Sequence, residues 1–164
     1  MRSSALLDVK PGPWVTQYPI DVVLNAPLKF AYSWCTDFSP LDSKLEKGNY
    51  TRWILEKTSA RIVFEDLAKT KTGWSWQRCI VTLNKPNRWR MEMIGNYRDV
   101  IAHYKLIPLG TNRTRLELRY KVRQTLRIAP MLTRTKRCQR NMQMWQKFSK
   151  ALERDYSKMH AHEK

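Results

Sequence analysis

Cysteine and glycine are scarce in this chain of 164 residues, and each scarcity excludes a class of site. The three cysteines, Cys35, Cys79 and Cys138, lie far apart and form no CxxC pair, which argues against a disulfide framework and against a zinc site. We expect them to be buried, reduced thiols, which suits a cytoplasmic protein. With only five glycines, the chain contains no Gly-rich loop that could bind a phosphate group.

Histidine is almost absent as well, since His103 is the only one outside the last five residues. The apolar Val100 and Ala102 alternate with His103 and Lys105, so we expect His103 to be a solvated surface residue. No Ser-His-Asp, Cys-His or paired-carboxylate arrangement can be assembled from the remaining residues. The sequence therefore predicts no catalytic residues, no metal ligands and no cofactor.

Long apolar runs are also missing. No segment approaches the roughly 18 apolar residues of a membrane span, and the N-terminus lacks the apolar core of a signal peptide. Hydrophobic residues nevertheless make up 42% of the chain, including seven Trp and seven Tyr, which is enough for one domain with a sizeable core. We predict an N-terminal extension over 1–13, a single domain over 14–159 and a frayed tail over 160–164.

The first elements of the domain are a strand and a short helix. Residues 14–24 alternate between apolar and polar side chains, which is typical of a half-buried strand. Asn25 can cap a helix that has Pro27 in its first turn, and a Ser-Pro pair ends that helix. Asp37, at the end of the helix, is expected to stabilise a turn rather than to act as an acid. A second short helix is expected over 41–46.

From Tyr50 onward the pattern is almost entirely β until a long final helix. The expected strands are 50–57, 60–67, 74–83, 88–94, 97–107 and 111–122. After Pro130 a helix is expected to run to about Lys158, with an apolar stripe wide enough to bury along most of its length. We therefore predict an α+β fold, in which a curved antiparallel sheet of about seven strands grips the C-terminal helix.

Two stretches resemble a known superfamily. VVLNAPLKFAYSWCTDFSPLD (22–42) resembles the opening strand, Ala-Pro and short helix of START-like, helix-grip (SRPBCC) proteins, and YKLIPLGTNRTRLELRYKV (104–122) resembles their last hairpin. The resemblance covers residues 14–158. It implies the polyketide cyclase and lipid-transport branch, with a ligand cavity between the sheet and the long helix. Only some members of the superfamily are enzymes, so the fold cannot decide the activity.

Candidate ligand-binding residues come from the inward faces of the strands and from the helix stripe. They are Trp76, Trp89, Met91, Met93, Tyr104, Leu118, Tyr120, Met142, Trp145 and Phe148. The methionines can adapt to irregular apolar ligands, and each tyrosine can give one directional hydrogen bond. The same side chains could instead fill a core. The strand over 74–83 also leaves open whether Trp74, Trp76 and Ile80 or Cys79, Val81 and Leu83 point inward.

Charge is strongly unbalanced, with 31 basic and 14 acidic residues and a net charge of +17. Residues 113–150 contain twelve basic side chains and one acid, Glu117. We expect an anionic surface to bind Arg127, Arg134, Lys136, Arg137 and Arg140. A membrane is the favoured partner, because each basic residue adds about 1 kcal/mol near an anionic leaflet. Nucleic acid is a less favoured partner, since no base-stacking platform is apparent, and a merely solvated face is the third possibility.

The sequence thus predicts a protein that binds or carries a hydrophobic small molecule, such as a lipid, polyketide or isoprenoid-like compound, and that is peripheral to a membrane. A polyketide cyclase or dehydrase-like enzyme is the first alternative, and a basic module for nucleic acid or a protein partner is the second. A cavity with a convergent acid/base pair would favour the enzyme. A cavity with apolar walls and one or two tyrosines would favour the carrier, and a filled core would exclude both.

Overall fold

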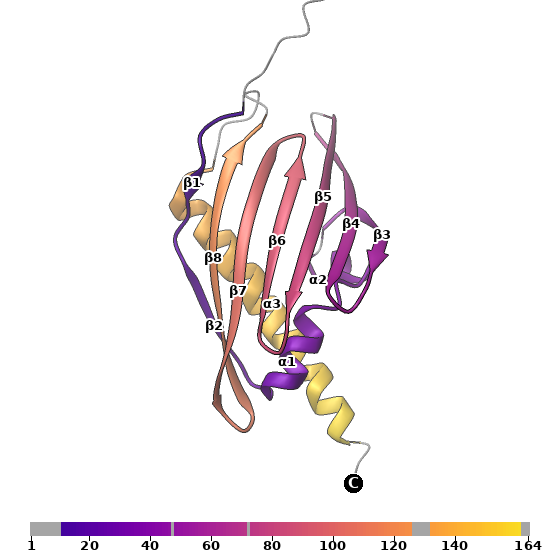
Figure 1. Ribbon diagram of the computed structural model, residues 1–164, viewed down its shortest axis with the longest axis vertical. Helices are drawn as coiled ribbons and strands as arrows, with labels where there is room; N and C mark the ends of the chain where they lie inside the picture. Colours follow the sequence, from indigo (N-terminus) through magenta and orange to yellow (C-terminus); the bar gives the residue numbers. More distant parts are fainter. Residues whose placement is uncertain (1–10, 47, 72, 126–131, 162–164) are drawn as a thin grey trace, which may run out of the picture.

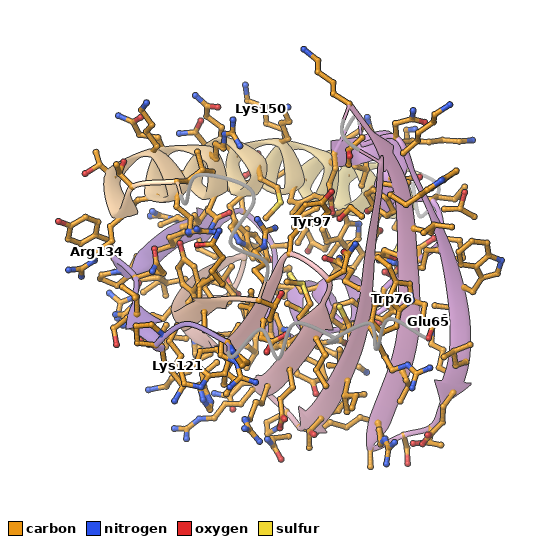
Figure 2. All side chains as sticks on the ribbon, turned by 90° about the horizontal axis from the view of Figure 1, so that it is seen from above. Glu65, Trp76, Tyr97, Lys121, Arg134 and Lys150 are labelled. Atoms are coloured by element: carbon orange, nitrogen blue, oxygen red, sulfur yellow. The ribbon has the colours of Figure 1, made fainter. Side chains whose placement is uncertain are left out.

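The computed structural model describes residues 11–46, 48–71, 73–125 and 132–161. In these residues an antiparallel sheet of eight strands curves around one side of a long helix (Figures 1 and 2). The strands are β1 (Val15–Thr16), β2 (Ile20–Leu24), β3 (Tyr50–Lys57), β4 (Arg61–Thr70), β5 (Gly73–Asn84), β6 (Arg88–Gly95), β7 (Arg98–Gly110) and β8 (Arg113–Gln124). The helices are α1 (Leu28–Cys35), α2 (Asp42–Glu46) and α3 (Arg134–Ala161). The predicted α+β helix-grip architecture is confirmed.

The strand order follows the chain from β3 to β8, and β1 and β2 both pair with β8 at the far edge. The single strand expected over 14–24 is therefore two strands. Proline lacks the amide hydrogen that a ladder needs, and Pro19 lies between β1 and β2. This break accounts for one strand more than the predicted seven.

The α1 helix begins one turn later than its predicted cap. Its N-cap is Pro27, and the side chain of Asn25 instead donates a hydrogen bond from Nδ2 to Oε1 of Glu153 on α3, at 2.9 Å. The capping role predicted for Asn25 is therefore wrong. The turn role predicted for Asp37 is confirmed, because its Oδ1 accepts the Ser39 amide at 3.1 Å.

The strands present one face to α3 and one to solvent, as period-2 alternation requires. On β8 the inward Leu116, Leu118 and Val122 are nearly fully buried, whereas His103 on β7 is exposed, as predicted. On β5, where the sequence left the inward face undecided, the odd-numbered residues point inward. Cys79 and Val81 are at most 1% exposed, while Trp74 is 57% exposed.

The α3 helix crosses the open side of the curved sheet (Figure 2). Leu152 and Trp145 join the core cluster that the inward faces of β2 and β4–β8 build, and Phe148 packs against it. Met159, the last residue of the predicted stripe, is 56% exposed and does not belong to the core. Among the described residues, no helix is both long and apolar enough to cross a membrane.

Candidate functional site

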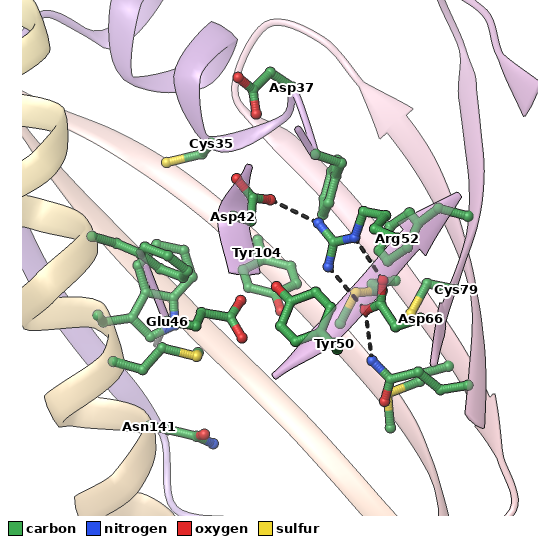
Figure 3. A pocket seen from close by; sticks show the side chains of 18 of the residues that line it. Cys35, Asp37, Asp42, Glu46, Tyr50, Arg52, Asp66, Cys79, Tyr104 and Asn141 are labelled. Carbon is green, nitrogen blue, oxygen red and sulfur yellow. Dashed lines mark hydrogen bonds and ion pairs between the residues drawn. The ribbon is translucent and has the colours of Figure 1, made fainter. Parts of the chain in front are cut away.

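A cavity of about 380 Å³ lies between the sheet, α2 and α3 (Figure 3). A volume of this size falls within the range of about 300–1,000 Å³ that is usual for small-molecule sites. The long α3 helix forms one wall, and the inward faces of β3–β7 form the other. The cavity therefore occupies the space that the resemblance predicted, and the core is not completely filled.

One part of the wall is aromatic. The Trp89 and Tyr104 rings stack with centroids 4.8 Å apart and planes 6° apart, and Trp145 of α3 contacts Tyr104 at 6.1 Å. Phe148 meets Trp145 edge-on at 5.5 Å and also contacts Trp34 of α1. These rings brace one another from the sheet and from two helices. They give a rigid apolar wall against which a flat hydrophobic ligand could pack.

The opposite part of the wall is polar and charged. The Arg52 guanidinium donates to both carboxylate oxygens of Asp66, at 2.8 and 2.9 Å, and to Oδ2 of Asp42 at 2.7 Å. Gln77 Nε2 donates to the same Asp66 group at 3.0 Å, and the Phe64 ring lies 4.1 Å from the guanidinium carbon. The Arg52 side chain is only 6% exposed. Its hydrogen bonds are directed at the protein, so Arg52 ties α2 to the sheet.

Two further groups at this end are less engaged. Burial raises the pKa of the Glu46 carboxyl above its usual range, although the neighbouring Tyr50 hydroxyl opposes that shift. Burial, and then the charge of Glu46, likewise raises the pKa of Tyr50. The buried Tyr50 hydroxyl lies close enough to the Glu46 carboxyl to affect its pKa, but it forms no hydrogen bond of good geometry with Glu46 or with any other described group. A carboxyl group with a raised pKa and a phenol thus lie together at the cavity wall (Figure 3).

A second compartment of about 240 Å³ adjoins the first and shares Met91, Met93 and Tyr104 with it. Its apolar walls come from β7 and β8. Tyr120 is among them, and its hydroxyl accepts a hydrogen bond from Asn141 Nδ2 at 2.8 Å. Burial raises the pKa of the Tyr120 hydroxyl. The two compartments together form an elongated space beneath α3.

Most of the predicted ligand-binding residues line this space. Those in the first compartment are Trp89, Met91, Met93, Tyr104, Trp145 and Phe148. Leu118 and Tyr120 line the second compartment. The structure thus brings eight of the ten residues together around one cavity. Whether they bind a ligand stays a prediction.

Trp76 and Met142 line neither of these two compartments. Trp76 lies on the outward face of β5, where its ring contacts the Arg78 guanidinium at 6.0 Å, because the odd-numbered residues of β5 point inward. Met142 packs against the core beside the cavity. Ser149, seven residues further along α3, contacts β2 through Val23 O, so this side of the helix faces β2. Asn141 and Met144 line the cavity instead.

Sequence reasoning missed the polar side chains of the cavity. Arg52 alternates with Trp53 on β3, and apolar residues on the outer face conceal the direction in which the arginine points. Glu46 is on a helix of five residues, which is too short to reveal a face. For Arg98 a signal existed. It precedes Val100, Ala102 and Tyr104 at period two, and this alternation places it on their inward face.

The predicted anionic-surface residues divide into three groups. Arg127 lies outside the described residues. Arg134, Lys136 and Arg140 are exposed on the first turns of α3, and Arg134 lies over the Tyr18 ring at 4.3 Å. Arg137 is only 7% exposed, so its assignment to the surface is wrong. It points toward the second compartment, because it lies one helical turn before Asn141 on the face that covers the sheet.

Two other features bear on the chemistry of the molecule. Among the described residues, no group of three His, Cys, Asp or Glu side chains is arranged to hold a metal ion. A broader depression of about 690 Å³ lies outside the sheet, between α1 and the β3–β4 and β5–β6 turns. This depression is more open to solvent and is bordered by Lys29, Lys57 and Lys85. It lacks the enclosing walls of the cavity beneath α3.

No family model and no curated protein sequence matches the chain. Solved structures do match. A Thermus thermophilus protein, TTHA0849, is 17% identical with a TM-score of 0.65, over 90% of this chain and 99% of that one. A START superfamily protein from Mycobacterium smegmatis is 14% identical with a TM-score of 0.64, over 88% and 99%. The Zhui aromatase/cyclase from a Streptomyces species is 13% identical with a TM-score of 0.59, over 87% and 90%. The chain therefore has the START-like, helix-grip fold.

Proposed function

We propose that this protein binds a hydrophobic small molecule, such as a lipid, polyketide or isoprenoid-like compound, between the sheet and α3. The observation that carries this proposal is the cavity itself, which remains open even though Trp89, Tyr104, Trp145 and Phe148 converge on it. A side-chain cluster that served only to stabilise the fold would close such a space, since each void costs packing energy.

The polar groups of the wall suggest how the ligand would be oriented. Arg52 already pairs with both Asp42 and Asp66, so its charge is balanced within the protein. The Tyr50 hydroxyl remains as a donor at that end of the cavity, beside the Glu46 carboxyl. A ligand with a carbonyl or hydroxyl group on an otherwise apolar skeleton would satisfy this donor.

The test is to obstruct the cavity without changing the outer surface. Ala68 lines the cavity from β4, and the next residue, Lys69, is exposed on the opposite face. The neutral probe N-phenyl-1-naphthylamine should bind the wild type and the Lys69→Trp variant, with increased fluorescence. The Ala68→Trp variant should lose this binding while keeping its far-UV circular dichroism spectrum.

Native mass spectrometry of the purified protein, followed by organic extraction, would identify a ligand that copurifies. The carrier proposal would be rejected if no molecule copurified and if Ala68→Trp bound the probe as tightly as the wild type does.

A second candidate function is a cyclase or dehydrase-like activity. The specific observation in its favour is the pair of Glu46 and Tyr50, because a carboxyl group with a raised pKa is suited to general acid catalysis. The Zhui aromatase/cyclase is a structural neighbour of this chain, although that likeness concerns the fold alone.

This activity can be tested with a β-hydroxyketone such as 4-hydroxy-4-phenylbutan-2-one, whose dehydration gives an enone with strong ultraviolet absorbance. An enzyme of this kind should form the enone in the wild type. Glu46→Gln should abolish enone formation and retain binding of the neutral probe. Absence of enone with a series of such ketones would leave binding as the function.

Because of the exposed basic residues at the start of α3, we also propose that the protein docks on a membrane surface. The proposed location is the cytoplasm. Arg140 lines the second compartment, and Arg134 and Lys136 are exposed on the same end of α3, so docking there would bring a lipid close to the cavity. Cosedimentation with phosphatidylserine vesicles should decrease steeply between 50 and 300 mM NaCl, and Arg134→Gln/Lys136→Gln should weaken it. Equal cosedimentation with neutral phosphatidylcholine vesicles would contradict this extension.

A further inference from the structure

Three arginines converge on the second compartment from two different elements. Arg98 is the first residue of β7 and lies on its inward face, while Arg137 and Arg140 belong to the first two turns of α3. All three line the second compartment, and Arg98 also lines the first. Positive charge is thus concentrated around the second compartment.

None of these arginines forms an ion pair with any acid in the described parts of the chain. The acid adjacent to Arg98 in the sequence, Asp99, points to the other face of β7 and pairs with Arg123 at 2.7 Å. Arg137 is 7% exposed, and its buried Nε has no hydrogen-bond partner among the residues described. Arg98 and Arg140 are exposed residues, whereas the guanidinium of Arg137 is buried without a counter-charge. Such burial is costly, so fold stability alone does not explain the position of Arg137.

The three charges also oppose one another. Partial desolvation of the guanidinium lowers the pKa of Arg98, although the residue as a whole is exposed, and the positive charges of Arg137 and Arg140 lower it further. Burial likewise lowers the pKa of Arg137, with a further contribution from Arg140. The positive end of the α3 dipole adds to this potential, because Arg137 and Arg140 lie near the helix N-terminus. An anion in the compartment would relieve the repulsion, and guanidinium groups match carboxylates and phosphates in geometry.

We propose that Arg98, Arg137 and Arg140 bind the carboxylate or phosphate head of an amphipathic ligand whose apolar part occupies the cavity. This inference rests on the proposed binding function and adds the charge of the ligand to it. The apolar part is required by the walls, since Val100, Leu118 and Val122 line the same compartment as the arginines. A small free anion would pair with the guanidinium groups and leave these walls uncovered.

The experiment compares ligands that share one chain and differ in the head group. Decanoic acid, decyl phosphate and 1-decanol would be titrated against the full-length protein by displacement of N-phenyl-1-naphthylamine, with acetate and inorganic phosphate as headgroup controls. We expect the two anions to bind at least tenfold more tightly than decanol. We expect acetate and inorganic phosphate to displace no probe at concentrations at which the anions saturate.

Two double variants, each of which removes two positive charges, test whether the arginines of the second compartment bind the head group. Arg98→Gln/Arg140→Gln should reduce the affinities for decanoate and decyl phosphate to that for decanol. Arg134→Gln/Lys136→Gln removes two exposed charges from the same end of α3 and should preserve the difference. Because the wild-type comparison of decanoate with decanol needs no variant, it tests the proposal even if the first variant does not fold.

Each outcome has a distinct meaning. Equal affinity for decanol and decanoate in the wild type, or equal loss in both double variants, would overturn the arginine site and leave the binding function intact. Saturable binding of inorganic phosphate as tight as that of decyl phosphate would also overturn it, in favour of a free anion. If decanoic acid, decyl phosphate and 1-decanol all failed to displace the probe, both the site and the proposed function would be overturned.

Discussion

Arg52 illustrates how one side chain can hold a helix to a sheet. It lies on β3, and its guanidinium forms a bidentate pair with the carboxylate of Asp66 on β4. The same guanidinium also donates a hydrogen bond to Asp42 at the start of α2. Removing the cation would leave the carboxylate of Asp66, which is 7% exposed, with only Gln77 as a partner. The whole cluster would therefore be affected by a single substitution.

We predict that Arg52→Met lowers the free energy of unfolding by about 3–5 kcal/mol, because it breaks a buried ion pair and leaves the carboxylate of Asp66 buried without a cation. Urea unfolding followed by circular dichroism would measure this change. Arg61→Met is the matched control, because the Arg61–Glu56 pair is exposed and should contribute less than about 1 kcal/mol. Equal losses in the two variants would contradict the role assigned to Arg52.

A second prediction concerns Cys79, a buried thiol of β5. Burial raises its pKa to about 12, from about 8.5 for a free thiol. Its folded-state pKa lies above its unfolded-state pKa, so its contribution to stability is complete below about pH 8.5 and is lost as the pH rises toward 12. The free energy of unfolding should therefore decrease between pH 8.5 and 10.5, and Cys79→Ala should make this decrease shallower.

Thiol alkylation offers an independent check on Cys79. At pH 8, iodoacetamide should modify Cys79 far more slowly in the native protein than in 8 M urea, since only the ionised thiol reacts. A steeper pH dependence in Cys79→Ala than in the wild type would show that other groups dominate this range.

At the scale of elements, α3 combines a structural half with a cavity-lining half. Leu152 is fully buried, whereas Met159, about two helical turns further on, is 56% exposed. We predict that Leu152→Ala lowers the free energy of unfolding by about 2–5 kcal/mol, and that Met159→Ala changes it by less than about 0.5 kcal/mol. Chemical denaturation of both variants tests this difference, and a similar cost at both positions would place the end of α3 in the core.

The strands and helices differ in how well they could be predicted from the sequence. Strands with a clean alternation, such as β8, and the long apolar stripe of α3 were predictable, because burial imposes one period on many residues. The break at Pro19 was missed because apolar side chains at even positions continue across it in the sequence. In the structure the phase changes there, since Val15 of β1 and Ile20 of β2 both lie opposite inward residues of β8. The orientation of β3 and β5 was hidden because Trp53 and Trp74 are apolar on the solvent face.

The same reasoning explains the outcome at the cavity. Its aromatic and methionine wall followed from the inward faces of regular strands, whereas Trp76 was a candidate on a strand whose inward face the sequence left open. The charged groups could not be found in this way. Arg52, Asp42 and Asp66 are far apart along the chain, and only the tertiary pairing of β3, β4 and α2 brings them together.

At the scale of the whole molecule, charge is the dominant unusual feature. With 31 basic and 14 acidic residues, even complete one-to-one pairing would leave 17 positive charges without a partner. Several of the pairs that do form, such as Arg119–Asp21, are about half exposed on both sides and contribute little. Net repulsion among the remaining charges should therefore oppose the folded state at low ionic strength.

We predict that the melting temperature rises as NaCl increases from 10 to 500 mM, because the screening length falls from about 30 Å to well under 10 Å. Differential scanning calorimetry at constant pH would measure it. The Arg98→Gln/Arg140→Gln variant should retain most of the rise, since screening acts on every charge and not on one site. A melting temperature that falls with salt would mean that the ion pairs across the sheet outweigh the repulsion. A rise lost entirely in this variant would instead mean that chloride stabilises the protein by binding at the arginines.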